Sequence, residues 1–429
     1  MSHQEHAAPV ENKFFTPGMK ILTAVMLTGL GFGLYRMIFG LEAATHLNDQ
    51  YPLGLWIGVD VATGVALAAG GFTSGALVYV FQREHFHAVI RPALLTAMLG
   101  YTFVGVGLMF DLGRWYNIWH PAIPFMWQGN SVLFEVGMCV MIYINVLYLE
   151  FAPIVCERFI GRVNLPVSIF PLNLLNQISS IVLRGSQKQI GEHPLNYLID
   201  MLLRFADHIL GKIMFVFILA GIVLSCCHQS SLGTLMVIAP YKMHPLYSSQ
   251  LGPLFFLTSA FAVGLTMIVF ESMIASHIFG RKPEMHILTP LSKIIPWLLG
   301  FYISIKLGDM LYRETYHFLF EGSAPVIMFW IEFGLLTVVP CCMLLSQDVR
   351  RSPRGLFIAT AMYIAGICLN RCTVFMIAYK PLYAQKAYIP ALSEFALTIG
   401  LIATIVFIYR LVVTVLPVLP MPETEKKQH

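Results

Sequence analysis

The residues best suited to chemistry in this sequence lie within or beside long apolar stretches. Asp60, Asp111, Glu135 and His228 stand out, because ionisable groups are costly in hydrocarbon and mark candidate functional sites there. Carboxyl and imidazole groups can bind the oxygen atoms of a ring and exchange protons with them. We therefore expect these four side chains to be the catalytic groups of one small-ligand pocket.

A second group of polar and aromatic residues follows the same stretches and is expected to orient a ligand or contact a partner. Convergent polar groups in an apolar wall are what a small-ligand pocket requires. A structural interpretation is the alternative, in which an Asp111–Arg114 ion pair fixes a loop and the other groups are ordinary hydrogen-bond partners. The expected binding residues are Arg114, Trp119, Asn130, Gln229, Tyr241 and Lys242.

A further set of charged residues lies in the apolar stretches of the second half of the chain. Opposite charges could satisfy one another there, and this structural interpretation is favoured; the alternative is a proton route. Glu150, Glu157 and Glu271 could form the inner mouth of such a route. The residues of the set are Lys306, Asp309, Glu332, Arg371 and Glu394.

Composition identifies the class of protein. Of the 429 residues, 57% are hydrophobic and only 12% are charged, and the mean hydropathy is +0.72. Soluble domains carry about 25% charged residues, so the chain is an all-α integral membrane protein. Its net charge of +4 gives no reason to expect nucleic-acid binding.

The sequence carries no pattern typical of a resident redox cofactor. Its cysteines form no C-x-x-C pair, and phosphate-binding glycine patterns are missing. A haem within the bilayer needs axial ligands, usually histidines, yet His208, His228 and His277 are predicted at helix ends and the other histidines in loops or tails. We therefore expect no haem, iron–sulfur cluster or metal site in this chain.

Ten apolar segments are long enough to cross a bilayer, since a spanning helix needs about 20 residues. They are predicted near residues 19–38, 54–82, 91–112, 129–155, 206–227, 250–279, 290–312, 323–346, 353–378 and 393–417.

The loops indicate the orientation of these spans. Lys and Arg are more frequent in the terminal tails and the even-numbered loops than in the odd-numbered loops. The positive-inside rule then places both termini in the cytoplasm. The longest loop, 156–205, would be cytoplasmic, and its charge-free piece NLPVSIFPLNLLNQISSIVL is predicted to be an interfacial helix. The aromatic loop after Asp111 would face the periplasm or exterior.

Several motifs carry a resemblance to a known family. The sequence is similar to the polysulfide-reductase/nitrite-reductase membrane-subunit family of the NrfD/PsrC type, and within it to the ten-helix branch of hydrogenase membrane subunits. The resemblance covers nearly the whole chain. The motifs are PLGLWIGVD at 52–60, RPALL at 91–95, NSVLFE at 130–135, HQSSLG at 228–233 and YKMHP at 241–245.

The resemblance implies two four-helix bundles and a flanking helix at each end. The tails would be 1–18 and 418–429, the flanking helices 19–38 and 393–417, and the bundles 54–227 and 250–378. It also implies that members carry no redox cofactor and bind a quinone, menaquinone or ubiquinone, near the outer surface. A ferredoxin-type iron–sulfur subunit would pass electrons to or from a further catalytic or multihaem subunit.

The resulting hypothesis is a quinone-reactive membrane anchor of a respiratory oxidoreductase in the inner (cytoplasmic) membrane. A secondary transporter or ion-translocating protein is the alternative, because ten helices with buried carboxylates suit that class too. No matched pair of Gly- or Pro-interrupted helices, as expected of inverted repeats, is evident in the sequence. A haem-bearing cytochrome b is a third interpretation, which the predicted histidine positions disfavour.

Overall fold

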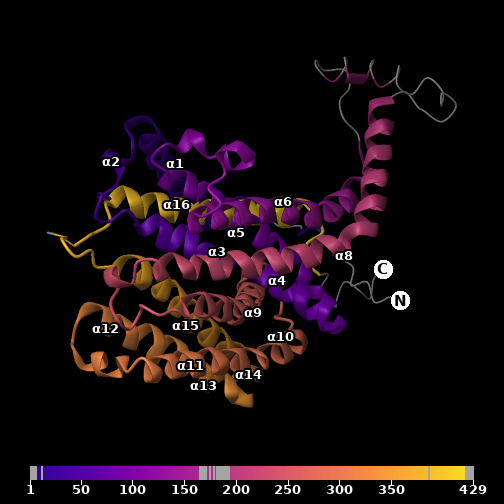
Figure 1. Cartoon of the computed structure of the whole chain (residues 1–429). Helices are drawn as coiled ribbons and strands as arrows, with labels where there is room; N and C mark the ends of the chain where they lie inside the picture. Colours follow the sequence, from indigo (N-terminus) through magenta and orange to yellow (C-terminus); the bar gives the residue numbers. More distant parts are fainter. Residues whose placement is uncertain are drawn as a thin grey trace.

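The chain folds into long helices that run side by side (Figure 1). The computed structural model describes residues 7–10, 13–163, 172, 175–176, 179, 194–384 and 387–420. In this part of the chain, ten helices are long and apolar enough to cross a membrane. The all-α membrane prediction is therefore confirmed.

The first five spans are α1 (Pro17–Phe39), a segmented second span (Trp56–Val80), His85–Asp111 with α5 (Ile90–Asp111), α6 (Val132–Phe159) and α8 (Pro194–Val237). The last five are α9 (Gly252–Ile278), Met285–Tyr312 with α10 (Met285–Ser292) and α11 (Ile295–Tyr312), Ala324–Leu345, Pro353–Ile377 with α15 (Pro353–Cys372), and α16 (Leu392–Val415).

Hydroxyl side chains begin several of these helices. The first amides of a helix have no partner within it, and a Ser or Thr oxygen can accept a hydrogen bond from one of them. Thr16 does so for α1, Ser131 for α6 and Ser352 for α15. A proline follows Thr16 and Ser352, where its missing amide costs nothing. These local signals explain why the predicted starts of α1 and α15 lie close to the observed ones.

The fifth span differs from the prediction. We predicted 206–227, whereas α8 runs from Pro194 to Val237. The polar run after Cys227 is typical of a helix end, but the side chains of His228, Gln229 and Ser231 are buried, so the helix continues through them. At its other end α8 extends away from the bundle (Figure 1). Most of the predicted interfacial helix, at 164–183, lies outside the described residues.

Long-range helix pairs organise the molecule. The flanking helices α1 and α16 pack against each other, α6 packs along α8, and α8 also contacts α9. In Figure 1, α16 lies beside α1 and α5, away from the neighbouring late helices α11 and α15. The Cβ of an added side chain at Gly400 would lie 2.4 Å from the Gly29 Cα, so α1 and α16 are in backbone contact. Such small-residue crossings are typical of helix packing in lipid.

Two hydrophobic clusters form most of the core. One contains Leu95, Tyr143 and Leu147 from α5 and α6, and the other contains Leu291 and Leu344 from later spans. The chain ends meet at one end of the helices, where the Ala8 amide donates to the Leu419 carbonyl over 3.2 Å. An even number of spans returns the chain to the side on which it began, in agreement with this contact.

The second span is not a regular helix. It consists of the π-helix η1 (Trp56–Thr63), α3 (Gly64–Leu67), α4 (Gly70–Gly75) and the π-helix η2 (Ala76–Val80). Between α3 and α4 the Ala69 amide donates to the Ala66 carbonyl, and the Val65 carbonyl accepts a side-chain bond from Gln229 of α8 over 2.9 Å. The break in the second span thus supplies an acceptor to the fifth.

Candidate functional site

Glu135 lies in the first turn of α6, where the Ser131 hydroxyl caps the helix. Its Oε1 accepts a hydrogen bond from the Ser231 hydroxyl of α8 over 2.6 Å. The Ser231 Oγ also contacts the Cys227 carbonyl at 3.0 Å. Glu135 itself is exposed at the helix surface. This pair therefore joins the start of α6 to the last turns of α8 and leaves a carboxylate accessible from outside the bundle.

His228 lies one turn deeper on α8 and its side chain is fully buried, with 0% of its surface exposed. Its Nε2 lies 2.5 Å from the Tyr101 hydroxyl, and the Tyr143 ring packs at 5.4 Å between ring centres. Within the described part of the chain, its Nδ1 has no hydrogen-bond partner. A buried imidazole with one free nitrogen can accept or donate a proton only through a group that reaches it from the bundle interior.

Gln229, the next residue, is held in the same interior. Its side-chain amide donates to the Val65 carbonyl, and the Tyr101 hydroxyl approaches the same carbonyl at 3.4 Å. The break in the second span, α5 and α8 thus meet at one point. Glu135, His228 and Gln229, all singled out from the sequence, lie on α6 and α8: Glu135 is exposed, and the other two are buried. Tyr101 and Tyr143 were missed, because a tyrosine in an apolar stretch is usually part of the core.

Asp60 and Asp111 lie elsewhere, against the flanking helices. The Asp60 Oδ2 accepts a hydrogen bond from Thr398 of α16 over 2.7 Å. The buried Arg36 of α1 donates from Nε to the Phe110 carbonyl over 2.7 Å, and it is an electrostatic neighbour of Asp111. The expected single pocket is therefore divided into an α6–α8 group and a flanking-helix group.

Glu394 of α16 completes the flanking-helix group. Its carboxylate accepts hydrogen bonds from the Tyr388 hydroxyl and from the Ala391 amide, the latter over 2.7 Å. Burial and the bond with Glu394 raise the pKa of the Tyr388 hydroxyl, which lies in the loop before α16. Arg36 could have been found in the sequence, since it is a charge near the end of the first apolar stretch.

The remaining expected residues lie in exposed loops at the end of the helices opposite the Ala8–Leu419 contact. Arg114, Trp119 and Asn130 belong to the loop between α5 and α6, where Phe125 is 99% exposed. Tyr241 is 86% exposed in the loop after α8, and the Lys242 carbonyl accepts from the Lys380 amide over 2.6 Å. These side chains lie at the surface and do not line the α6–α8 interior.

His244 in the same outer loop is largely buried. Its Nε2 lies 3.4 Å from Glu321, and its Nδ1 accepts from the Leu246 amide over 3.3 Å. Burial lowers the pKa of the His244 imidazole, and the Glu321 contact offsets part of this shift.

The charged set of the second half is satisfied only in part by opposite charges. The Lys306 Nζ lies 3.5 Å from Glu332, whose Oε1 also accepts from Asn370 over 2.9 Å. Asp309 pairs with Arg313 at 2.8 Å. Arg371 instead donates to neutral groups, including the Ser259 hydroxyl at 2.8 Å.

π-Helical turns accompany several of these polar groups. Asp60 lies in η1, Glu332 lies in the π-helix η9 (Trp330–Val338), and Arg371 precedes the π-helix η10 (Thr373–Ile377). In η1 and η9 a threonine hydroxyl donates to the carbonyl five residues earlier, over 2.9 and 2.7 Å. π-Helical turns are rare in proteins, and those that do occur are often found at functional sites.

Comparison with known proteins identifies the family. The family model described as "Polysulphide reductase, NrfD" matches residues 64–382, which is more than half of the chain. This chain belongs to the NrfD family. The resemblance inferred from the motifs at residues 52–60, 91–95 and 130–135 is thereby confirmed.

Full-length relatives agree with the NrfD assignment. The "Probable Ni/Fe-hydrogenase 2 b-type cytochrome subunit" of Escherichia coli (strain K12) is 32% identical over 433 residues, covering 100% of this chain and 99% of the relative. The "Menaquinone reductase, integral membrane subunit" of Nitratidesulfovibrio vulgaris is 24% identical, with 96% of each chain covered. A selenate reductase subunit of Mesobacillus selenatarsenatis is 24% identical, with 93% of each covered.

One premise about histidines needs correction in this NrfD protein. His208 and His228 were predicted at helix ends, but both lie within α8, where His208 is exposed and His228 is buried. The described residues contain no group of three or more His, Cys, Asp or Glu side chains placed to hold a metal ion. The ring nitrogen of His228 that has a partner faces the Tyr101 hydroxyl.

Proposed function

We propose that this NrfD protein is the quinone-reactive membrane anchor of a multi-subunit respiratory oxidoreductase. It exchanges electrons between the quinone pool, menaquinone or ubiquinone, and a partner subunit on the outer side. Relatives named as subunits of a menaquinone reductase and a hydrogenase support this function. The observation that carries it is the α6–α8 group, in which Glu135 and His228 lie on one helix pair.

Reduction of a quinone takes up two electrons and two protons, and oxidation of the quinol releases them. In the proposed site the accessible Glu135 carboxylate exchanges protons with the outside and Ser231 orients it. His228, held by Tyr101, provides a second proton-accepting group one turn deeper. General acid–base groups of this kind act through atoms within hydrogen-bond reach of the reacting oxygen. Asp60 and Asp111 act as a separate acidic group beside the flanking helices.

The electron partner in this proposal is a ferredoxin-type iron–sulfur subunit, followed by a further catalytic or multihaem subunit. The α5–α6 loop would form its docking surface, since Phe125, Trp119 and Trp127 are exposed there. Aromatic side chains and arginine are enriched at protein interfaces, and Arg114 lies in this loop. Tyr241 and Lys242, in the neighbouring outer loop, would complete that surface.

The orientation is part of the proposal. Both termini would be cytoplasmic in the inner membrane, because Lys and Arg concentrate at the end where Ala8 meets Leu419. In the proposed bundles, 54–227 and 250–378, the start of α6, the end of α8 and the start of α9 would then face the periplasm. We further propose that the chain holds no haem, so that the purified subunit lacks a Soret band.

Coupling to proton translocation is the second candidate, and the Lys306–Glu332 contact favours it. A charged pair this deep in a bilayer is costly and is typical of ion pathways. In the coupled form, quinone chemistry in the first half would drive protons past this pair. In the other version of this candidate, the chain has no quinone activity and is a transporter-like protein.

The deciding experiment is affinity purification of the chain from its native membrane, followed by identification of its partners and a quinone-turnover assay. Glu135→Gln keeps the size of the side chain and removes its acid, so turnover should fall about 10²–10⁴-fold, the usual contribution of a general acid–base group, while the complex stays assembled. Glu42→Gln, which changes an exposed carboxylate outside both groups, is the matched control. Unchanged turnover in Glu135→Gln would remove that residue from the site, and a lone, redox-silent protein would favour the transporter.

A further inference from the structure

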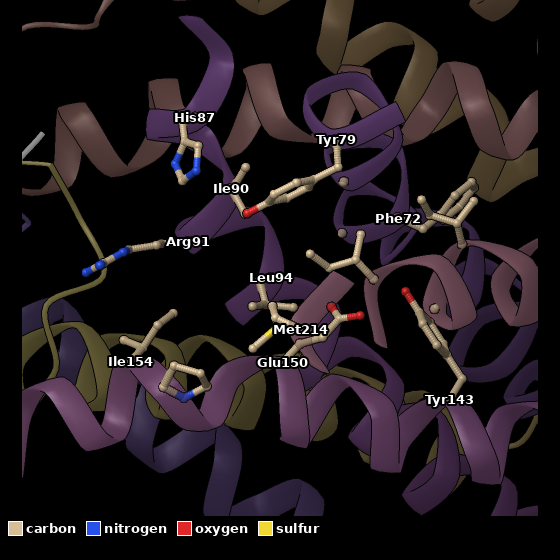
Figure 2. Close-up of a pocket in the computed structure, with 16 residues that line it drawn as sticks. Phe72, Tyr79, His87, Ile90, Arg91, Leu94, Tyr143, Glu150, Ile154 and Met214 are labelled. Carbon is tan, nitrogen blue, oxygen red and sulfur yellow. The ribbon is translucent and has the colours of Figure 1, made fainter. Parts of the chain in front are cut away.

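A cavity of about 200 Å³, shown in Figure 2, is lined by Arg91 at the start of α5 and Ile154 near the end of α6, whereas Glu135 lies at the start of α6. Its walls come from the second span, α5, α6 and α8. Glycines make room for it: the Cβ of an added side chain at Gly75 would meet only Ile218, at 3.7 Å. Tyr79 in its wall is 36% exposed, so the cavity is open to the surface of the helices.

Glu150 of α6 supplies the deepest polar group of this cavity. The Cβ of a side chain added at Gly221 of α8 would lie 2.8 Å from the Glu150 Oε1. The glycine therefore leaves room for the carboxyl group to lie against α8. Within the described part of the chain, the Glu150 carboxyl has no hydrogen bond or ion pair with another residue. A carboxyl group at membrane depth with no cation beside it is accommodated as the neutral acid, which donates a hydrogen bond.

The cation nearest the mouth of the cavity is already engaged. The Arg91 Nη2 forms an ion pair with Glu157 at 2.7 Å, and its Nη1 donates to the Pro417 carbonyl over 2.9 Å. A phosphate head group at Arg91 would lie beside the Glu157 carboxylate, which would repel it. The cavity therefore favours an uncharged ligand that accepts hydrogen bonds over an anionic lipid.

The walls suit a flat ring. Figure 2 shows the Tyr79 and Tyr143 rings and the Glu150 carboxyl group around the same space. Phe72 adds a third aromatic ring, His87 and Arg91 are further polar groups, and most of the remaining wall is aliphatic. Aromatic walls with a few polar groups are typical of sites for small ring-shaped ligands. Glu150 and the tyrosine hydroxyls can donate hydrogen bonds to two separate acceptor oxygens.

We propose that this inner cavity is a second binding site for the head group of an isoprenoid quinone or quinol, with Glu150 donating to one ring oxygen. The choice of ligand rests on the proposed function, but the site is separate from the outer α6–α8 group. The isoprenoid tail leaves the cavity beside Met214 into the lipid. The site holds the head group and involves no electron-transfer step.

Photoaffinity labelling with an azidoquinone, applied to the intact purified complex, tests this assignment. We expect labelled peptides at 71–79, 143–154 or 214–222, and competition by unlabelled quinone. Gly75→Leu fills the cavity without touching a polar group and should lower this labelling about tenfold, as should Glu150→Leu, which removes a buried hydrogen bond. Gly31→Leu is the control, since an added side chain there meets nothing within 4 Å.

The labelled positions separate this inference from the proposed function. Label confined to the outer peptides around Glu135 and Ser231 would overturn the inner site and support the outer one. Label confined to the inner peptides would support the inner site and argue against the outer one. Inner labelling that persists in both Gly75→Leu and Glu150→Leu, or a phospholipid found at this position by native mass spectrometry, would refute the inner quinone site.

Discussion

Removal of one hydroxyl group, in Tyr101→Phe, tests whether the buried His228 belongs to the working site. The hydroxyl serves two acceptors, but the Val65 carbonyl keeps its 2.9 Å bond from Gln229. The Nε2 of the fully buried His228 loses its partner at 2.5 Å. An unsatisfied buried polar group costs about 1–3 kcal/mol. The free energy of unfolding should fall by that amount.

Quinone turnover should fall in parallel, because 1.4 kcal/mol corresponds to a factor of ten. A cost of about 1–3 kcal/mol in holding the imidazole predicts a loss of roughly 5- to 100-fold. Turnover and thermal unfolding are measured on the same purified complex. Tyr148→Phe is the control, since that hydroxyl bonds Thr102 at 2.9 Å on the exposed face of α6 and its loss should change stability by less than about 0.5 kcal/mol.

A double variant sharpens the test. In a His228→Leu background the Tyr101 hydroxyl has no imidazole to hold. Tyr101→Phe should therefore lower the free energy of unfolding much less there than in the native chain. Equal costs in the two backgrounds, or equal effects of Tyr101→Phe and Tyr148→Phe, would refute the reasoning that the hydroxyl acts through His228.

Three other perturbations have expected outcomes. Gly400→Ala pushes α1 away from α16 and should lower the free energy of unfolding by about 1–3 kcal/mol, measured by thermal unfolding. Gly31→Ala has free space around it and should not lower the stability. Lys306→Met leaves Glu332 without its cation and should cost about 3–5 kcal/mol, partly recovered by adding Glu332→Gln; no recovery would contradict the pairing. Because burial lowers the pKa of His244, its contribution to stability is complete above about pH 6.5 and is lost as the pH falls. Melting temperatures between pH 5 and 8 should therefore depend less on pH in His244→Gln.

The sequence is a good guide to this fold because lipid imposes a simple rule. A spanning segment must be long, apolar and helical, and that pattern can be read locally. Nine of the ten predicted spans lie within a few residues of the observed ones. The fifth failed because the residues after Cys227 are polar. Their partners, Tyr101 and Val65, are far away in sequence, so nothing local shows that they are satisfied.

The candidate site was predicted less completely for the same physical reason. Position along a helix indicates depth in the membrane, and Glu135 and His228 do lie near one end of the α6–α8 pair. Which way a side chain faces depends on the neighbouring helix. The pairing of α1 with α16 joins the two ends of the chain, and it draws Asp60 toward Thr398 and away from Glu135.

The break in the second span has a consequence for how the protein is made. In lipid every backbone polar group needs a partner, and the Val65 carbonyl finds one in Gln229, which is 164 residues further along the chain. At about 5–20 residues per second, the ribosome needs roughly 8–30 seconds to produce that partner. The Tyr101 hydroxyl of the third span comes only within 3.4 Å of that carbonyl, so the shorter bond of the second span forms when the fifth arrives. A substitution of Gln229 should therefore show its first effect during biogenesis, as slow assembly and proteolysis of the nascent chain.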